Sequence, residues 1–133
     1  MGGVPPVVRY VIVCKDVVVD SVNPQRITIV ELISSIKSLD YPPFPLTRRE
    51  LCVFVQLTEC RGAGGVRVEI VLADTGQPVA RTKTRSITFS GYPLEILGFV
   101  FRIQDCTFPD AGLYLVQFWY NDSMIAEHPL LLR

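Results

Sequence analysis

The sequence lacks the spacing of apolar residues that a helix requires, in any of its segments. It has instead short runs rich in Val, Ile, Phe, Tyr and Thr, which ten prolines and nine glycines separate. Such runs are typical of β-sandwiches and barrels. The 133 residues suffice to bury about two-thirds of the unfolded chain's surface around one core. We therefore expect a single all-β domain over residues 1–133, with no substantial helix.

The chain also lacks an excess of charge of either sign, because 13 basic residues balance 13 acidic ones. This balance gives no reason to expect nucleic acid or anionic lipid as a partner. No apolar run is long enough to span a bilayer, and the N-terminus has no secretion signal. Pro6 occupies the position where an N-terminal acylation signal requires Ser or Thr. We expect a cytoplasmic protein that binds neither membrane nor nucleic acid.

Metal ligands are scarce, since the chain has one histidine and no C-x-x-C pair. A zinc site would need four scattered thiolates, or three thiolates and His128. We expect no cofactor and no metal, and we expect free thiols packed as small apolar groups. The thiols are Cys14, Cys52, Cys60 and Cys106. Six aspartates are also too dispersed for a calcium loop, namely Asp16, Asp20, Asp40, Asp105, Asp110 and Asp122.

Catalysis needs titratable groups that converge, and the spacing of the residues indicates no such group. A cysteine paired with His128, with Asp105 or Asp110 nearby, is the alternative to consider. We predict no catalytic residue and a protein that is not an enzyme.

The most specific motif is Asp110-x-Gly112-x-Tyr114, which precedes a strand over residues 112–120. This spacing is typical of the tyrosine corner of immunoglobulin-like sandwiches, where a tyrosine hydroxyl bonds back to the preceding backbone. Val116 stands where antibody domains have a cysteine, so no inter-sheet disulfide is expected. The motif predicts an immunoglobulin-like Greek-key sandwich of about seven to nine antiparallel strands.

Further strands are expected along the whole chain. The first covers residues 7–13, and residues 17–19 form either its continuation or a second short strand. A long β-branched run at 26–36 is expected to be one strand, with Glu31 at an edge or facing solvent. Residues 37–50 contain three prolines and are expected to cross between the sheets as a loop. The other strands are expected at 51–59, 66–72, around 81–85, at 96–104 and after a turn at 121–123.

Two segments suggest ligand sites but have simpler explanations. Residues 60–65 contain three glycines and an arginine but no P-loop lysine, so we expect a flexible hairpin loop. Arg81, Lys83 and Arg85 alternate along a predicted strand. Charges on a solvated edge strand protect it against aggregation, which explains them without a ligand.

The alternation of residues 113–120 predicts an apolar strip on the outside of the sheet. If Tyr114 points into the core, then Leu113, Leu115, Gln117 and Trp119 point away from it. A large apolar strip with a central tryptophan is typical of a protein interface. Alternatively, residues 38–50 or the N-terminal segment cover this strip within the chain.

Three aromatic residues in predicted loops form a candidate ligand surface. Tyr41, Phe44 and Tyr92 lie where rings that stack on sugars would be needed. The alternative is that the rings of the 37–50 loop close one open end of the sandwich.

Five segments of the sequence resemble a known family: V-x-Y-V-I-V-C-x-D-V, R-I-T-I-V, L-C-V-F-V-Q-L-T, F-P-D-A-G-L-Y and A-E-H-P-L. The family consists of short bacterial proteins described only as a domain of unknown function. The resemblance covers nearly the whole chain and implies an immunoglobulin-like fold and a bacterial, cytoplasmic setting. It carries no catalytic or ligand residue to transfer.

We therefore predict a non-enzymatic module for protein interaction or assembly, which binds a protein partner or forms a homodimer through the outer strip. The alternative function is a small-ligand or carbohydrate-binding sandwich that uses the loop aromatics. An enzyme is the third candidate.

Overall fold

The computed structural model describes residues 5–89, 92 and 94–133 and contains ten strands. No helix occurs in these residues, and hence none that could cross a membrane. The all-β prediction is confirmed, although the strands outnumber the expected seven to nine. The strands are β1 (Val7–Val19), β2 (Ile27–Leu32), β3 (Ser35–Ile36), β4 (Leu46–Thr58), β5 (Ala63–Leu72), β6 (Pro78–Arg81), β7 (Arg85–Thr88), β8 (Leu97–Phe108), β9 (Gly112–Tyr120) and β10 (Ser123–Leu132).

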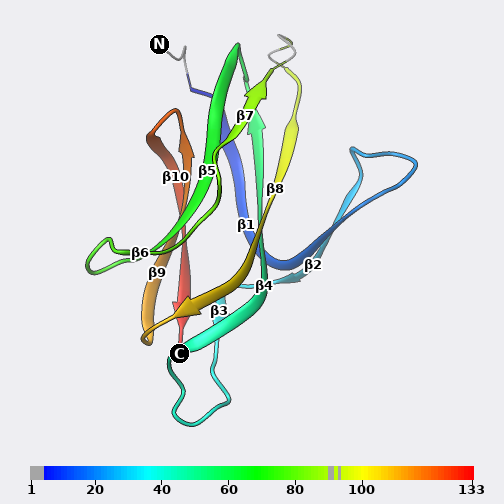
Figure 1. The fold of residues 1–133 in the computed structure, drawn as a ribbon. Helices are drawn as coiled ribbons and strands as arrows, with labels where there is room; N and C mark the ends of the chain where they lie inside the picture. Colours follow the sequence, from blue (N-terminus) through cyan, green and yellow to red (C-terminus); the bar gives the residue numbers. More distant parts are fainter. Residues whose placement is uncertain (1–4, 90–91, 93) are drawn as a thin grey trace.

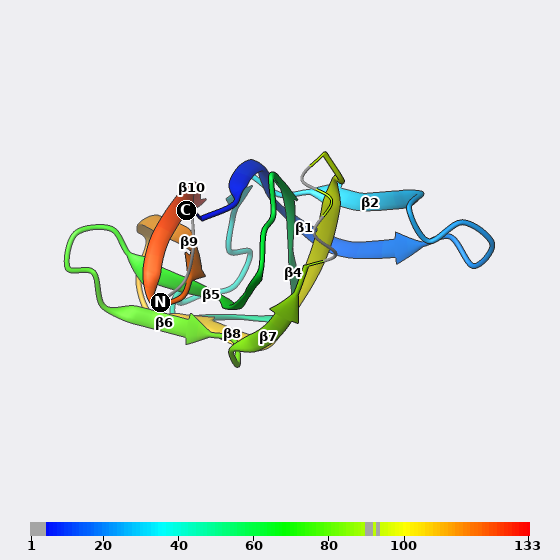
Figure 2. The same cartoon turned by 90° about the horizontal axis from the view of Figure 1, so that it is seen from above.

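The strands form two sheets that pack face to face around the main core (Figures 1 and 2). The four-stranded sheet has the order β2-β1-β4-β8. The six-stranded sheet has the order β3-β10-β9-β5-β6, and β7 also pairs with β5. Alternate residues of the long strands point inward, because side chains alternate along a strand. The four-stranded sheet contributes residues such as Val53 and Phe101 to the core, and the six-stranded sheet contributes residues such as Val68 and Phe118.

The run at 26–36 is not one strand, which corrects the prediction. Glu31 has a φ of 52°, a left-handed conformation that interrupts the ladder. The chain then leaves the four-stranded sheet, and β3 pairs with β10 of the other sheet. This pairing is parallel, so the expectation of antiparallel strands alone is wrong at this edge.

Three other predicted boundaries need correction. The 37–50 loop is shorter than expected, because β4 begins at Leu46, directly after the last proline of the segment. Gly64 and Gly65 lie within β5 and not in a loop. The basic stripe does not lie on one strand, since Arg81 ends β6 and Arg85 begins β7. At the start of the chain, residues 17–19 continue β1.

The predicted tyrosine corner is present. Tyr114 is fully buried, and its hydroxyl donates to the carbonyl of Asp110 at 2.7 Å. The amide of Asp110 donates back to the same hydroxyl oxygen at 3.3 Å. Gly112 has a φ of 136°, which glycine adopts readily. This corner fixes the start of β9, and therefore which of its residues face outward.

The predicted C-terminal hairpin is also present. β9 and β10 pair along their lengths, and Asn121 and Asp122 connect them with φ angles of 47° and 65°. Two successive positive φ angles define a type I′ turn, whose twist matches that of the strands. The hairpin thus places the outward residues of β9 and β10 side by side.

Candidate functional site

The outward residues of β9 lie where the alternation predicts. Tyr114, Val116, Phe118 and Tyr120 are buried in the main core. Leu113 is 44% exposed, and the three following outward residues are half-buried. They are Leu115, Gln117 and Trp119.

The register places these residues in the middle of the outer face, by which we mean the side of the six-stranded sheet away from the core. On β5, Val71 lies opposite Leu115, and Glu69 and Arg67 lie opposite Gln117 and Trp119. The outward residues of β10 opposite those of β9 are Met124, Glu127, Pro129 and Leu131. Cross-strand neighbours of this kind are about 5 Å apart, so the outer face is a continuous surface.

Trp119 is covered by an arginine of its own chain. The guanidinium carbon of Arg67 lies 4.6 Å from the centre of the Trp119 ring, which is a cation–π contact. The indole N–H of Trp119 donates to Gln117 Oε1 at 3.3 Å. Of the two coverings expected from the sequence, residues 38–50 do not provide this contact, and residues 1–4 of the N-terminal segment lie outside the described residues. The tryptophan is therefore held in one orientation.

A buried carboxylate anchors this arginine. Glu69 is 5% exposed and accepts a hydrogen bond from Arg67 Nε at 2.8 Å. Arg67 also donates to Asp122 at 3.0 Å, and the contact with Glu69 is the main reason that the pKa of Arg67 is raised. In the sequence, Val66, Val68, Ile70 and Leu72 alternate with Arg67 and Glu69, a pattern that predicts one buried face and does not predict a buried Glu69. The Arg67-x-Glu69 spacing, which places opposite charges on one face, is the signal that could have found the pair.

Charges of opposite sign lie at the two sides of the outer face. Arg81 on β6 reaches Glu69 with an Nε to Oε2 distance of 3.4 Å. On the other side, Gln117 Nε2 donates to Glu127 of β10 at 3.5 Å. One row across the sheet therefore reads Arg81, Glu69, Gln117, Glu127.

An apolar area lies on one side of this row. Leu113 and Leu131 are opposite each other and are 44% and 40% exposed. Leu115 and Pro129 form the next pair, and Val71 continues it on β5. The apolar strip predicted from the sequence is therefore partly open to solvent.

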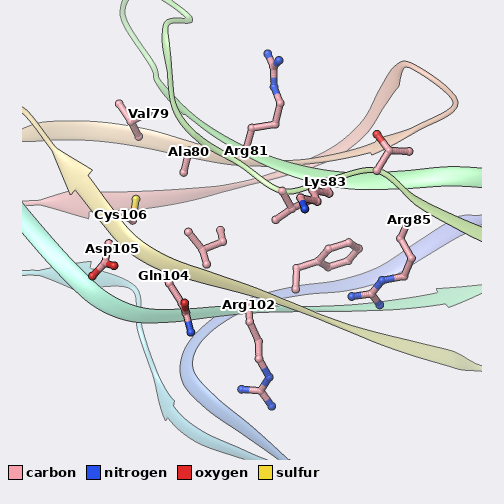
Figure 3. A pocket seen from close by; sticks show the side chains of 13 residues that line it. Val79, Ala80, Arg81, Lys83, Arg85, Arg102, Gln104, Asp105 and Cys106 are labelled. Atoms are coloured by element: carbon pink, nitrogen blue, oxygen red, sulfur yellow. The ribbon is translucent and has the colours of Figure 1, made fainter.

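The basic stripe lines a groove of about 630 Å³ between β6, β7 and β8 (Figure 3). Its arginines are already engaged. Arg81 pairs with Glu69, and Arg102 pairs with Asp16 at 2.6 Å. Figure 3 shows these two side chains pointing away from each other on opposite sides of the groove. Arg85 lies 4.9 Å above the Phe101 ring and donates to the carbonyl of Val100 at 2.9 Å. Arg85 thus links β7 to β8 of the other sheet, whereas Arg81 and Arg102 each pair within their own sheet.

The loop aromatics do not share one surface. Tyr41 is 98% exposed in the loop between β3 and β4, and Phe44 of the same loop packs against the main core. Tyr92, which is 60% exposed, follows β7 and precedes β8. The end of β7 and the start of β8 lie at the opposite end of the molecule from the β3–β4 loop (Figure 1). Of the three rings, Phe44 occupies the position expected for a loop that closes the core.

The four thiols are buried and unpaired, as expected. Burial raises the pKa of Cys14 and of Cys106 to about 11, and it is also the main reason that the pKa values of Cys52 and Cys60 are raised. Cys14 and Cys52 are cross-strand neighbours, whereas His128 lies on β10 of the other sheet. In the described part of the chain, no three His, Cys, Asp or Glu side chains are grouped to hold a metal ion.

Comparisons with known proteins give a family and a distant structural match. Residues 9–133 match the family described as "Family of unknown function (DUF6941)", so the chain belongs to this family. No curated protein matches it. Among solved structures, the Pseudomonas fluorescens alkylpurine DNA glycosylase AlkC bound to DNA containing an abasic site analog matches with a TM-score of 0.43 and 15% identity. That match covers 75% of this chain and 28% of the glycosylase, and a likeness this distant carries no functional inference.

Proposed function

We propose that the chain is a non-enzymatic assembly module, and that the outer face of its six-stranded sheet binds a second copy of the chain. The observation that carries the proposal is the rigid, partly open apolar area beside a row of complementary charges. The tyrosine corner supports the further proposal that the sandwich is of the immunoglobulin type.

The charge row favours a second copy over a foreign partner. A two-fold axis parallel to the strands, between β5 and β9, brings the β6 side of one copy over the β10 side of the other. Arg81 of each copy then faces Glu127 of the other. An isologous interface requires such self-complementarity. Arg67 on β5 and Trp119 on β9 lie on either side of this axis. Arg67 of each copy therefore faces Trp119 of the other.

The apolar area supplies the free energy of association. Leu113, Leu115, Pro129 and Leu131 lose contact with water when the two faces meet, and apolar area contributes roughly 25 cal/mol per Å² removed from water. The contact of Trp119 with Arg67 lowers the conformational entropy that the interface must remove.

The test is Leu113→Lys, which places a charge in the apolar area without changing a buried side chain. We expect the variant to associate at least about tenfold more weakly, because a desolvated, unpaired charge is strongly unfavourable. Tyr10→Lys is the matched control, since Tyr10 is 57% exposed on the other sheet. Sedimentation velocity over a concentration series gives the dissociation constants. Equal association of the native chain and Leu113→Lys, with both folded, would show that the outer face is not the interface.

A further inference from the structure

The end of β1 and the strand β2 form an arm that projects from the sandwich (Figures 1 and 2). Its apolar side chains are unusually open to solvent. Val18 and Val19 are 50% and 49% exposed, Val22 at the tip is 91% exposed, and Leu32 is 72% exposed. Exposed apolar residues gathered on one projecting element indicate an interaction surface.

β2 is the last strand of its sheet, so one of its edges has no partner in the described chain. The carbonyl of Arg26 accepts a hydrogen bond from the amide of Asp20, on the β1 side. Because backbone groups alternate along a strand, Ile27 and Ile29 direct their N–H and C=O groups away from β1. Residues 27–32 contain no proline or lysine that would protect this edge.

We propose that β2 pairs antiparallel with β2 of a second copy, about a two-fold axis at Thr28. Thr28 then lies opposite Thr28 of the other copy, and Ile27 lies opposite Ile29 on each side. This register pairs the residues whose backbone groups point outward. It joins the two four-stranded sheets into one continuous sheet.

The charges at the ends of β2 favour this antiparallel arrangement of identical strands. Arg26 precedes the strand and Glu31 lies near its other end, and neither forms a salt bridge in the described part of the chain. Antiparallel pairing brings the Arg26 end of one copy toward the Glu31 end of the other. Parallel pairing would bring like charges together.

The same register joins apolar side chains of the two copies. Ile27 and Ile29 pack against a second core cluster formed by Cys14, Val17, Cys52 and Phe54 on the outer side of the four-stranded sheet. Pairing Ile27 with Ile29 therefore joins the two clusters across the axis. Leu32 lies level with Pro24 of the other copy, at the tip of the second arm.

This edge lies in the four-stranded sheet, so the inference does not rest on the outer face of the other sheet. A chain that used both two-fold contacts would form an open-ended row of copies, because each copy would bind two neighbours. The Leu113→Lys background separates the two proposals, since it removes the outer-face contact and leaves the β2 edge intact.

The first test is cross-linking of Thr28→Cys in the Leu113→Lys background. Two thiols on the axis exchange with oxidised glutathione to form one disulfide between copies, and two molecules of reduced glutathione are released. Val30→Cys is the matched control, because two thiols at that position are too far apart for a disulfide. We expect covalent dimer from Thr28→Cys at least about tenfold faster than from Val30→Cys. Equal rates of covalent dimer formation by the two variants would overturn the register.

The second test blocks the edge. Ile29→Pro removes an N–H that points away from β1, whereas Ile29→Ala keeps it. In the Leu113→Lys background, we expect light scattering to give a dimer for Ile29→Ala and a monomer for Ile29→Pro. Circular dichroism confirms that each variant is folded. A folded Ile29→Pro variant that remains dimeric would exclude pairing through β2. If Ile29→Pro does not fold, the cross-linking result alone decides.

Discussion

Tyr114 connects the strand that bears the candidate interface to the turn before it. The side chain is fully buried, and its hydroxyl makes both hydrogen bonds of the corner. Tyr114→Phe keeps the ring and removes both bonds. We expect the free energy of unfolding to fall by about 1–2 kcal/mol, as for a hydrogen-bonded group that loses its partner. Urea denaturation measures this, with Tyr10→Phe as an exposed control that leaves stability unchanged.

Because of the buried thiols, we expect the free energy of unfolding to fall at alkaline pH. The pKa of Cys106 rises from 9.0 to about 11 in the folded chain because burial disfavours the thiolate. The folded state therefore holds this proton more tightly than the unfolded state. The resulting stability is complete below the unfolded pKa and is lost as the pH rises through about 9 to about 11. We expect Cys106→Ala to reduce the slope of stability against pH in urea denaturation over this range. An unchanged slope would contradict the assignment.

The tyrosine corner and Glu69 show which contacts can be predicted from local sequence. The corner depends on three residues within five positions, so its spacing is visible in the sequence. The buried carboxylate of Glu69 is paired with Arg67, two residues away on the same strand, and with Arg81, which approaches from another strand. The first pair has a local signal in the sequence, whereas the second partner is brought by the fold and leaves none.

At the scale of elements, the β-branched runs predicted strands correctly but not where they break. Residues 26–36 have uniform β propensity, yet the chain changes sheet after the left-handed Glu31. Residues 81–85 alternate regularly, but Thr82 bonds to Val68 through both its amide and its hydroxyl, and the strand is interrupted there. Propensity describes the strand, whereas the competing tertiary contacts decide its ends.

Gly64 in β5 is required because the ring of Tyr120 lies close to its backbone. A Cβ on Gly64 would lie 2.5 Å from Cε2 of Tyr120, whose ring is buried against Phe89. We expect Gly64→Ala to destabilise the fold by about 1–3 kcal/mol through overpacking. Thermal unfolding measures the loss.

A double-mutant cycle isolates this contact. In a chain that carries Tyr120→Leu, the added methyl group of Gly64→Ala has no ring to displace. We expect the second substitution to cost clearly less there than in the native chain. Additive losses would mean that strand propensity, and not the close approach, explains the glycine.

At the scale of the molecule, the two sheets leave different surfaces open. The six-stranded sheet has a rigid outer face in which a central ion pair separates Trp119 from the apolar area around Leu113 and Leu131. The four-stranded sheet has a free edge on a projecting arm. The alternation of β9 predicted the first surface. For the second, the sequence predicted only that Glu31 lies at an edge or faces solvent, which agrees with its exposed position on the edge strand β2.

The most direct test of assembly through the outer face is the molar mass in solution, measured by light scattering on a sizing column. The comparison uses the Ile29→Pro chain, in which the β2 edge is blocked, and the same chain with Leu113→Lys added. We predict a dimer for the first and a folded monomer for the second. If both chains have the mass of a monomer, or if both remain dimers, the outer face does not bind a second copy and the account is contradicted.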